Sequence, residues 1–173
     1  SSDLDGFSYD ILGTSGVHWK RLEILLDAAK EVNPDFKIML MPDMEAVFKS
    51  KPEALVPAIK KLANHPSVYK LDDGRLVLSA FNAQKQTPEW WAKAFEELKQ
   101  SGIEIAFVPV FQAYWKYTDD YAKVSYGFSD WGCGTNEEEV TDKRKKAPQS
   151  IHSKGKLWMC PVRPQDFRPK SQM

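Results

Sequence analysis

Short apolar runs that each end in a polar residue recur along this chain. The run at residues 36–43, Phe-Lys-Ile-Met-Leu-Met-Pro-Asp, is preceded by Asn33-Pro34 and closes on Asp43. A run of this length between turn residues predicts a strand that is buried on both faces. Pro42 interrupts the ladder of backbone hydrogen bonds and leaves the charge of Asp43 at the carboxyl end of the strand.

The same pattern predicts six strands in all. We expect them at residues 6–12, 36–43, 75–82, 103–112, 124–131 and 157–162. The polar residues at or just after their carboxyl ends are Asp10, Asp43, Asn82, Gln112, Asp130 and Arg163. Strands of this kind that alternate with helices indicate a βα-repeat, whose functional edge is the rim at the carboxyl ends of the strands.

Amphipathic patterns predict a helix in each interval between strands. We expect a first helix that ends before Asn33. Four further helices are expected at residues 50–63, 87–102, 113–122 and 137–153, the last partly broken by Pro148. The apolar stripe of the first helix consists of Trp19, Leu22, Leu25, Leu26 and Ala29. Ser50 and Glu53 match a capping box. Thr87-Pro88 and Gly102 match the start and the end of a helix.

The spacing of the predicted strands favours a (β/α)8 barrel, an α/β fold, over an open sheet. One strand follows the next after roughly 20 to 40 residues, as right-handed βα units require. No Gly-x-Gly-x-x-Gly motif follows a strand, and polar residues close nearly every strand rather than two strands at a switch point. A complete barrel needs eight strands and about 250 residues. This chain has 173 residues, so we expect either an incomplete barrel of about six βα units or a smaller open sheet.

Composition indicates a single neutral domain. No linker divides the chain, so residues 1–173 are expected to form one partial barrel domain, and the 24 basic and 24 acidic side chains balance. This balance offers no electrostatic case for nucleic acid or an anionic membrane as a partner. The apolar runs are too short to span a bilayer, and Ser1 begins no signal peptide, which suggests a mature or internal stretch. Charged runs at 137–139 and 143–146 are expected to form a solvated face.

Few residues are suited to a metal site. The three histidines are scattered, and neither a Cys-x-x-Cys nor a His-x-x-x-His motif occurs, so we expect no metal and no cofactor. Cys133 and Cys160 allow one disulfide, but two separate, partly buried thiols are favoured. The aromatic share of 12%, with six tryptophans, is suited either to filling a core or to stacking on sugars.

The polar strand ends are expected to converge at one rim together with aromatic side chains. The polar set is Asp10, Asp43, Asn82, Gln112 and Asp130, and the aromatic set is Tyr9, Trp115 and Trp131, with Phe81, Phe111 and Tyr114 nearby. Carboxylates and amides hydrogen-bond hydroxyl groups, and aromatic rings cover the apolar face of a sugar. A phosphate would call for a Gly-rich loop or clustered basic residues. We therefore expect the rim to bind a neutral polyhydroxylated ligand.

Each polar candidate also has a purely structural explanation. Asp10 can cap the segment that follows it, and Asp43 can be an acid at a helix N-terminus. Asn82 can hold a turn. Gln112 can satisfy a buried backbone group, and Asp130 can be a structural acid bonded within its own loop. These alternatives stay open at the level of sequence.

Four segments carry a combination of motifs that is more specific than any one of them. They are Gly6-Phe7-Ser8-Tyr9-Asp10, Phe36-Lys37-Ile38-Met39-Leu40-Met41-Pro42-Asp43, Gly74-Arg75-Leu76-Val77-Leu78-Ser79-Ala80-Phe81-Asn82 and Gly127-Phe128-Ser129-Asp130-Trp131-Gly132. In this order the set resembles the family-71 glycoside hydrolases, the α-1,3-glucanases or mutanases, over most of the chain. The resemblance implies a (β/α)8 barrel of which our six strands are the second to the seventh. It also implies a secreted enzyme that hydrolyses α-1,3-glucosidic bonds of a polysaccharide without a metal.

Two parts of the family pattern are missing from the chain. In the family, the acid/base pair lies in a Trp-Asn-Asp-Tyr-Gly-Glu-like segment after the last strand, and nothing similar follows Val162; the first strand is absent as well. The catalytic residues are therefore unknown. Two positions do match the family, Asp43 at the end of its third strand and Asn82 at the end of its fourth, which implies substrate-binding or supporting roles. The remaining segment of the barrel is an expected partner.

Three functions follow from these observations. The leading hypothesis is that the chain forms part of a barrel enzyme that cleaves α-glucan with paired carboxylates. In isolation the chain is then expected to be inactive. The second is a carbohydrate-binding protein without catalysis that uses the same rim. The third is a hydrolase or transferase on an open sheet, which is weakened because no Gly-x-Ser-x-Gly nucleophile elbow occurs.

Overall fold

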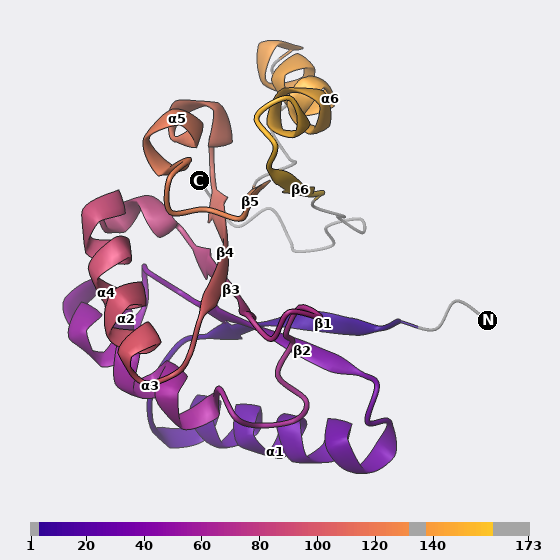
Figure 1. Cartoon of the computed structure of the whole chain (residues 1–173), viewed down its shortest axis with the longest axis vertical. Helices are drawn as coiled ribbons and strands as arrows, with labels where there is room; N and C mark the ends of the chain where they lie inside the picture. Colours follow the sequence, from indigo (N-terminus) through magenta and orange to yellow (C-terminus); the bar gives the residue numbers. More distant parts are fainter. Residues whose placement is uncertain (1–3, 132–137, 161–173) are drawn as a thin grey trace, which may run out of the picture.

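Six parallel strands form one sheet in the order β1-β2-β3-β4-β5-β6 (Figure 1). The computed structural model describes residues 4–131 and 138–160. The strands are β1 (Gly6–Ile11), β2 (Lys37–Pro42), β3 (Leu76–Phe81), β4 (Ile105–Phe111), β5 (Gly127–Asp130) and β6 (Leu157–Met159). The parallel, sequential order predicted from the βα spacing is confirmed, and no described strand is out of sequence.

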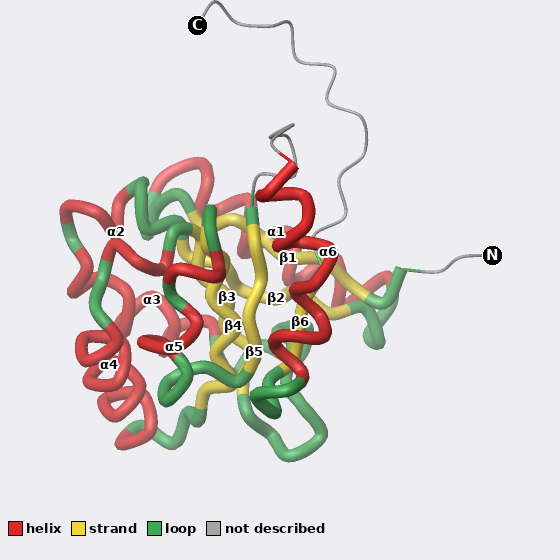
Figure 2. The backbone as a smooth tube through the Cα atoms, turned by 90° about the horizontal axis from the view of Figure 1, so that it is seen from above, coloured by secondary structure: helices red, strands yellow, loops and turns green. Residues whose placement is uncertain are grey.

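Helices occupy the intervals between the strands. They are α1 (Gly16–Val32), α2 (Val47–Ser50), α3 (Leu55–Leu62), α4 (Pro88–Gln100), α5 (Thr118–Tyr121) and α6 (Glu138–His152), with 3-10 turns η1 (Pro52–Ala54), η2 (Ala83–Lys85) and η3 (Tyr114–Lys116). Figure 2 shows the strands in the middle of the molecule and the helices outside them. This layering is that of a (β/α) barrel.

The two faces of the sheet differ, as alternating side chains require. Ile38 and Leu40 of β2 point to the large core that the sheet forms with the helices. Between them, Met39 points the other way and packs with Val77 and Val108 in a small second cluster. We call this second side the inner face.

The inner face is hollow, and the sheet curls around it. A cavity of about 510 Å³ is lined by the beginnings of β1 and β2 together with Met159 at the end of β6. The first and last strands therefore face a shared interior. At the beginning of β1, a Cβ atom added to Gly6 would come within 2.0 Å of the Lys37 carbonyl oxygen, so the close approach of β1 to β2 requires glycine at this position.

Helix ends follow local chemistry at some sites and tertiary packing at others. Thr87 caps α4 as predicted, because its side chain accepts a hydrogen bond from the backbone N–H of Trp90, and Gly102 follows the helix with φ = +77°. The predicted capping box at Ser50 is wrong. Ser50 instead ends α2, where its hydroxyl donates to the Val47 carbonyl, and Lys51 precedes η1 without a side-chain cap.

Two predicted elements differ in extent, and one residue differs in burial. The aromatic helix expected over 113–122 is split into η3 and α5. The strand expected from Val124 begins only at Gly127, because the N–H groups of Val124 and Ser125 both donate to the Tyr121 carbonyl and continue the turn after α5. Leu25, placed on the inward stripe of α1, is 37% exposed. Cys133, Val162 and Arg163 lie outside the described residues.

Candidate functional site

The carboxyl ends of β1 to β5 form a continuous rim, as the sequence predicts. The backbone N–H of Asp43 donates to the Ile11 carbonyl, that of Met44 to the Phe81 carbonyl, and that of Trp131 to the Phe111 carbonyl. These bonds tie the residues that follow β2 and β5 to the ends of neighbouring strands. Side chains at these positions are therefore held in a fixed spatial order.

Asp10 lies on the inner face near this rim. It pairs with Met41 across the β1–β2 ladder, and its side chain is accessible to solvent. Partial burial, and secondly the negative charge of Asp43, raise the pKa of Asp10 to about 6. A carboxyl group with this pKa is largely protonated in mildly acidic solution, where it can donate a hydrogen bond as well as accept one.

Asp43 is held by the turn that follows β2. Its Oδ1 accepts a hydrogen bond of 2.7 Å from the backbone N–H of Glu45, an arrangement in which an aspartate side chain stabilises a turn. Glu45 in turn forms ion pairs with Lys85 (2.6 Å) and Lys49 (3.0 Å). Hydrogen bonds from these lysines, first Lys85 and then Lys49, lower the pKa of the Glu45 carboxyl. Asp43 thus has a structural role in its turn while its charge acts on Asp10.

Asn82 also holds a turn. Its backbone adopts φ = 51° and ψ = 47°, the left-handed conformation, which asparagine tolerates better than most residues. The side chain is buried, and its Oδ1 accepts a hydrogen bond of 3.1 Å from Nε2 of Gln84. Gln112, which follows β4, is exposed to solvent.

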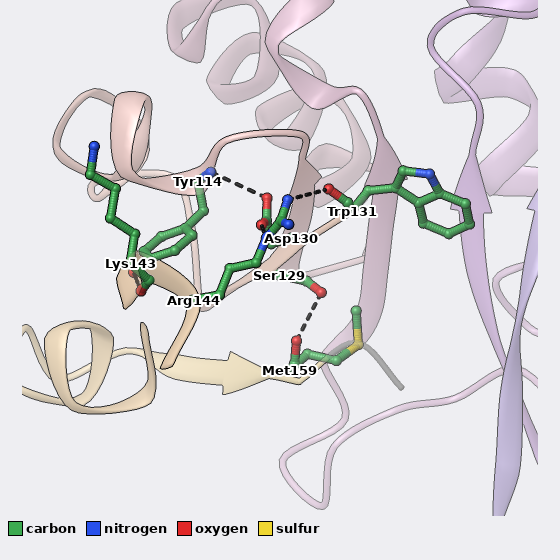
Figure 3. Close-up of polar contacts among 7 residues, drawn as sticks. All are labelled: Tyr114, Ser129, Asp130, Trp131, Lys143, Arg144 and Met159. Carbon is green, nitrogen blue, oxygen red and sulfur yellow. Dashed lines mark hydrogen bonds and ion pairs between the residues drawn. The ribbon is translucent and has the colours of Figure 1, made fainter. Parts of the chain in front are cut away.

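Asp130 is buried on the helix side, not on the inner face. It pairs in the ladder with Phe111, a residue of the large core. Its Oδ2 accepts a bond of 2.7 Å from Nε of Arg144 in α6, and its Oδ1 accepts one of 3.3 Å from the Tyr114 N–H (Figure 3). Burial raises the pKa of Asp130, and the Arg144 hydrogen bond and charge oppose this rise. The buried carboxylate of Asp130 is therefore paired with Arg144 of α6, a partner outside its own loop.

The next residue, Trp131, presents its ring to solvent. The residue is 53% exposed, and its ring meets that of Phe81 edge-on, with ring centroids 5.2 Å apart and planes at 77°. Phe81 pairs with Asp43 across an isolated bridge. The two rings form an aromatic platform beside the rim carboxylates, and we call the pair the Phe81–Trp131 platform.

Two other predicted aromatic residues lie away from this platform. Tyr9 faces the helix side, where its hydroxyl donates to the His18 carbonyl at 3.1 Å. Trp115 packs edge-on against Tyr114 and lies under Nζ of Lys143, 5.1 Å from the ring centroid. Both side chains pack on the helix side, so neither joins Asp10 on the inner face.

The role of Arg144 is not apparent from the sequence. It belongs to a run of four basic residues that we expected to be a solvated face, but its side chain is only 16% exposed. No periodicity marks Arg144, because the acid that it neutralises, Asp130, belongs to strand β5 and not to α6 itself. Phe81, noted only as a neighbour of the rim, proves to be half of the platform.

Two features are absent from the part of the chain that the structure describes. Within residues 4–131 and 138–160, no group of three or more His, Cys, Asp or Glu side chains could hold a metal ion. None of the helices in this part of the chain is long and apolar enough to cross a membrane.

Comparison with known proteins places the chain in a family of glycoside hydrolases. Residues 1–170 match the family model of glycosyl hydrolase family 71. The chain is 26% identical over 170 residues to glucan endo-1,3-alpha-glucosidase agn1 of Schizosaccharomyces pombe, a match that covers 93% of this chain and 39% of the relative.

Solved structures show the same fold. The endo-alpha-mannosidase of family GH99 from Bacteroides thetaiotaomicron superposes with a TM-score of 0.69 at 17% identity, over 90% of this chain and 48% of the mannosidase. Its complex with Bis-Tris propane gives a TM-score of 0.68 at 18% identity, over 90% and 50%. The chain thus spans about half the length of these structures and less than half of the curated relative. The six-stranded incomplete barrel and the match over residues 1–170 show that the chain belongs to glycoside hydrolase family 71.

Proposed function

We propose that this chain is the substrate-binding part of an enzyme that hydrolyses α-1,3-glucosidic bonds of α-glucan. The observation that carries the proposal is the placement of Asp10, Asp43 and the Phe81–Trp131 platform together at the open rim of a family-71 barrel. The relative agn1 is named as a glucan endo-1,3-alpha-glucosidase, which supports this linkage over others.

The chemistry of the rim is suited to a glucan. Asp10, Asp43 and Gln112 offer oxygen and amide groups to sugar hydroxyls, while the exposed ring of Trp131 can cover the apolar face of a glucose unit. Asn82 and Asp130 would support the rim from below, because both are buried. In this proposal Tyr9 and Trp115 stabilise the scaffold and do not touch the sugar.

The acid/base pair of the reaction is not assigned to any residue of this chain. Glycoside hydrolysis needs two carboxyl groups on opposite sides of the scissile bond. We propose that both come from the remaining segment of the barrel, so that the chain in isolation is inactive. Residues 1–173 would then be one part of a single catalytic domain. Secretion, which family membership supports, remains a prediction.

Substitution of Asp43 in the full-length parent enzyme tests the proposal. Asp43→Asn keeps the shape and the Oδ1 acceptor for Glu45 but removes the charge near Asp10. We expect hydrolysis of α-1,3-glucan to fall by about one to four orders of magnitude, the range for a lost charge-stabilising group. The free energy of unfolding should change by less than about 1 kcal/mol.

The matched control is Asp119→Asn, at an exposed carboxylate on α5 that pairs with Lys154; it should leave the rate unchanged. Full activity of Asp43→Asn would contradict the proposal and leave Asp43 as a turn residue. If the parent instead shows no turnover and only its affinity for α-glucan oligosaccharides falls, the protein is a carbohydrate-binding module.

A further inference from the structure

We propose that Arg144 is a positioning residue, which holds Trp131 at the rim so that its ring can stack on a sugar. The inference rests on the proposed function, since it gives the ring of Trp131 a glucan as its ligand. It assigns α6 a part in substrate binding, although no residue of α6 was expected at the site.

Arg144 binds two consecutive residues at the end of β5. Its Nε donates to the Asp130 carboxylate at 2.7 Å, and its Nη2 donates to the Trp131 carbonyl at 3.2 Å (Figure 3). The planar guanidinium group offers several N–H donors in fixed directions. A lysine at this position has a single nitrogen and lacks this fork.

The backbone of Trp131 is held from two sides. Its N–H donates to the Phe111 carbonyl at 2.6 Å, which ties it to β4, and its carbonyl accepts the bond from Arg144. Together these bonds set the direction in which the side chain leaves the backbone. The ring accordingly stands edge-on to Phe81 while more than half of its surface remains open to a ligand.

Arg144 is itself anchored by the packing of α6. The hydroxyl of Tyr114 donates to the Lys143 carbonyl at 2.8 Å, directly beside Arg144. Further along the helix, Ala147 and Ile151 are fully buried in the large core. Because α6 is held in place, Arg144 holds the end of β5 at a fixed position relative to α6.

The first measurement follows the ring of Trp131 without any ligand. The full-length parent enzyme is labelled with 5-fluorotryptophan, and the ¹⁹F resonance of Trp131 is assigned with Trp131→Phe. We expect Arg144→Lys to shift or broaden this resonance and to leave unchanged the resonances of Trp19 in α1 and of Trp90 and Trp91 in α4. An unaltered Trp131 resonance would overturn the inference.

A paired substitution keeps the test valid if Arg144→Lys does not fold. Asp130→Asn combined with Arg144→Met removes both charges, so that no buried carboxylate is left without its partner, and it also removes the bond to the Trp131 carbonyl. The matched control is Asp119→Asn with Lys154→Met, which removes an ion pair between α5 and the segment just after the C-terminal end of α6. Only the first pair should alter the Trp131 resonance.

The second measurement is the affinity for an α-1,3-linked gluco-oligosaccharide, by isothermal titration calorimetry. We expect Trp131→Ala and the Asp130→Asn/Arg144→Met pair each to weaken binding by roughly threefold to tenfold, the scale of one aromatic contact. If Trp131→Ala weakens binding but the pair binds normally, the positioning role is overturned. If Trp131→Ala itself binds normally, the stacking assumed by the proposed function fails instead.

Discussion

Two carboxyl groups with raised pKa values lie at strand ends, and their surroundings differ. Asp130 is buried with Arg144 as its counter-ion, so its burial is compensated by an ion pair and hydrogen bonds. Asp10 is accessible to solvent and has a second carboxylate, Asp43, close enough to raise its pKa further. A like-charge pair at an open rim is unfavourable for folding and useful for function. We therefore expect substitution of Asp10 to affect mainly activity and substitution of Asp130 to affect mainly stability.

The pKa of Asp10 gives a prediction at this scale. We expect ¹³C NMR of the labelled carboxyl groups to show Asp10 titrating at about pH 6. Asp43→Asn removes the repulsion and should lower that pKa, but not to the ordinary value of about 3.9, because burial is the larger cause. A pKa of Asp10 that Asp43→Asn leaves unchanged would contradict this account.

The sign of the associated stability change follows from linkage. The folded state binds the Asp10 proton more tightly than the unfolded state does. The contribution of Asp10 to stability is therefore fully present below about pH 4 and is lost as the pH rises through about 6. Asp10→Asn should remove this part of the pH dependence, measured as the free energy of unfolding in urea between pH 4 and pH 7.

At the scale of elements, local sequence determines some helix starts and not others. Thr87 caps α4 because Pro88 sets the first helical turn and the backbone of Thr87 is extended. Ser50 is likewise followed, two residues later, by a proline, which predicts a helix start. However, Ser50 is the last residue of α2, and its hydroxyl donates to the Val47 carbonyl. The chain then reaches α3 through η1 without the expected cap.

The cap of α4 is open to a direct test. Thr87→Ala removes the acceptor for the Trp90 N–H, which lies 3.2 Å from Oγ1, and should lower the free energy of unfolding by about 1 kcal/mol. Thr87→Ser retains the acceptor and serves as the control, with a change of only a few tenths of a kcal/mol. Equal destabilisation by both substitutions in urea unfolding would show that the cap is not the cause.

At the scale of the whole molecule, the two outer strands have open edges. Within residues 4–131 and 138–160, β1 pairs only with β2 and β6 only with β5. Beside β1, the exposed surface of α1 includes Val17, Ile24 and Val32, which are 60%, 65% and 85% exposed. Unpaired edges next to exposed apolar side chains favour association.

We therefore expect the isolated chain to associate in solution. Light scattering after size-exclusion chromatography should show species larger than the 19.8 kDa monomer. Ile24→Lys places a charge in the apolar surface of α1 and should shift the population towards monomer, whereas Gln100→Lys, which adds the same charge on α4, should not. A monodisperse monomer of the unmodified chain would show that something else covers these edges.

The sequence by itself determined the order and direction of the strands. Apolar runs of strand length separated by helical patterns leave few alternatives to a parallel sheet in sequential order, and a run such as residues 36–43 is recognisable without its neighbours. The polar residues that end these runs were also found, because the rim is where apolar runs stop.

Only the tertiary structure decided which face each rim residue occupies. Adjacent residues in a strand point to opposite sides, so Tyr9 and Asp10 cannot both face the interior, nor can Asp130 and Trp131. Pairing with β2 and packing against α1 turn Tyr9 outwards and leave Asp10 inside. Arg144, from a separate helix, fixes Asp130 on the helix side and leaves the ring of Trp131 at the rim. These outcomes depend on contacts between residues far apart in the chain, which no local pattern encodes.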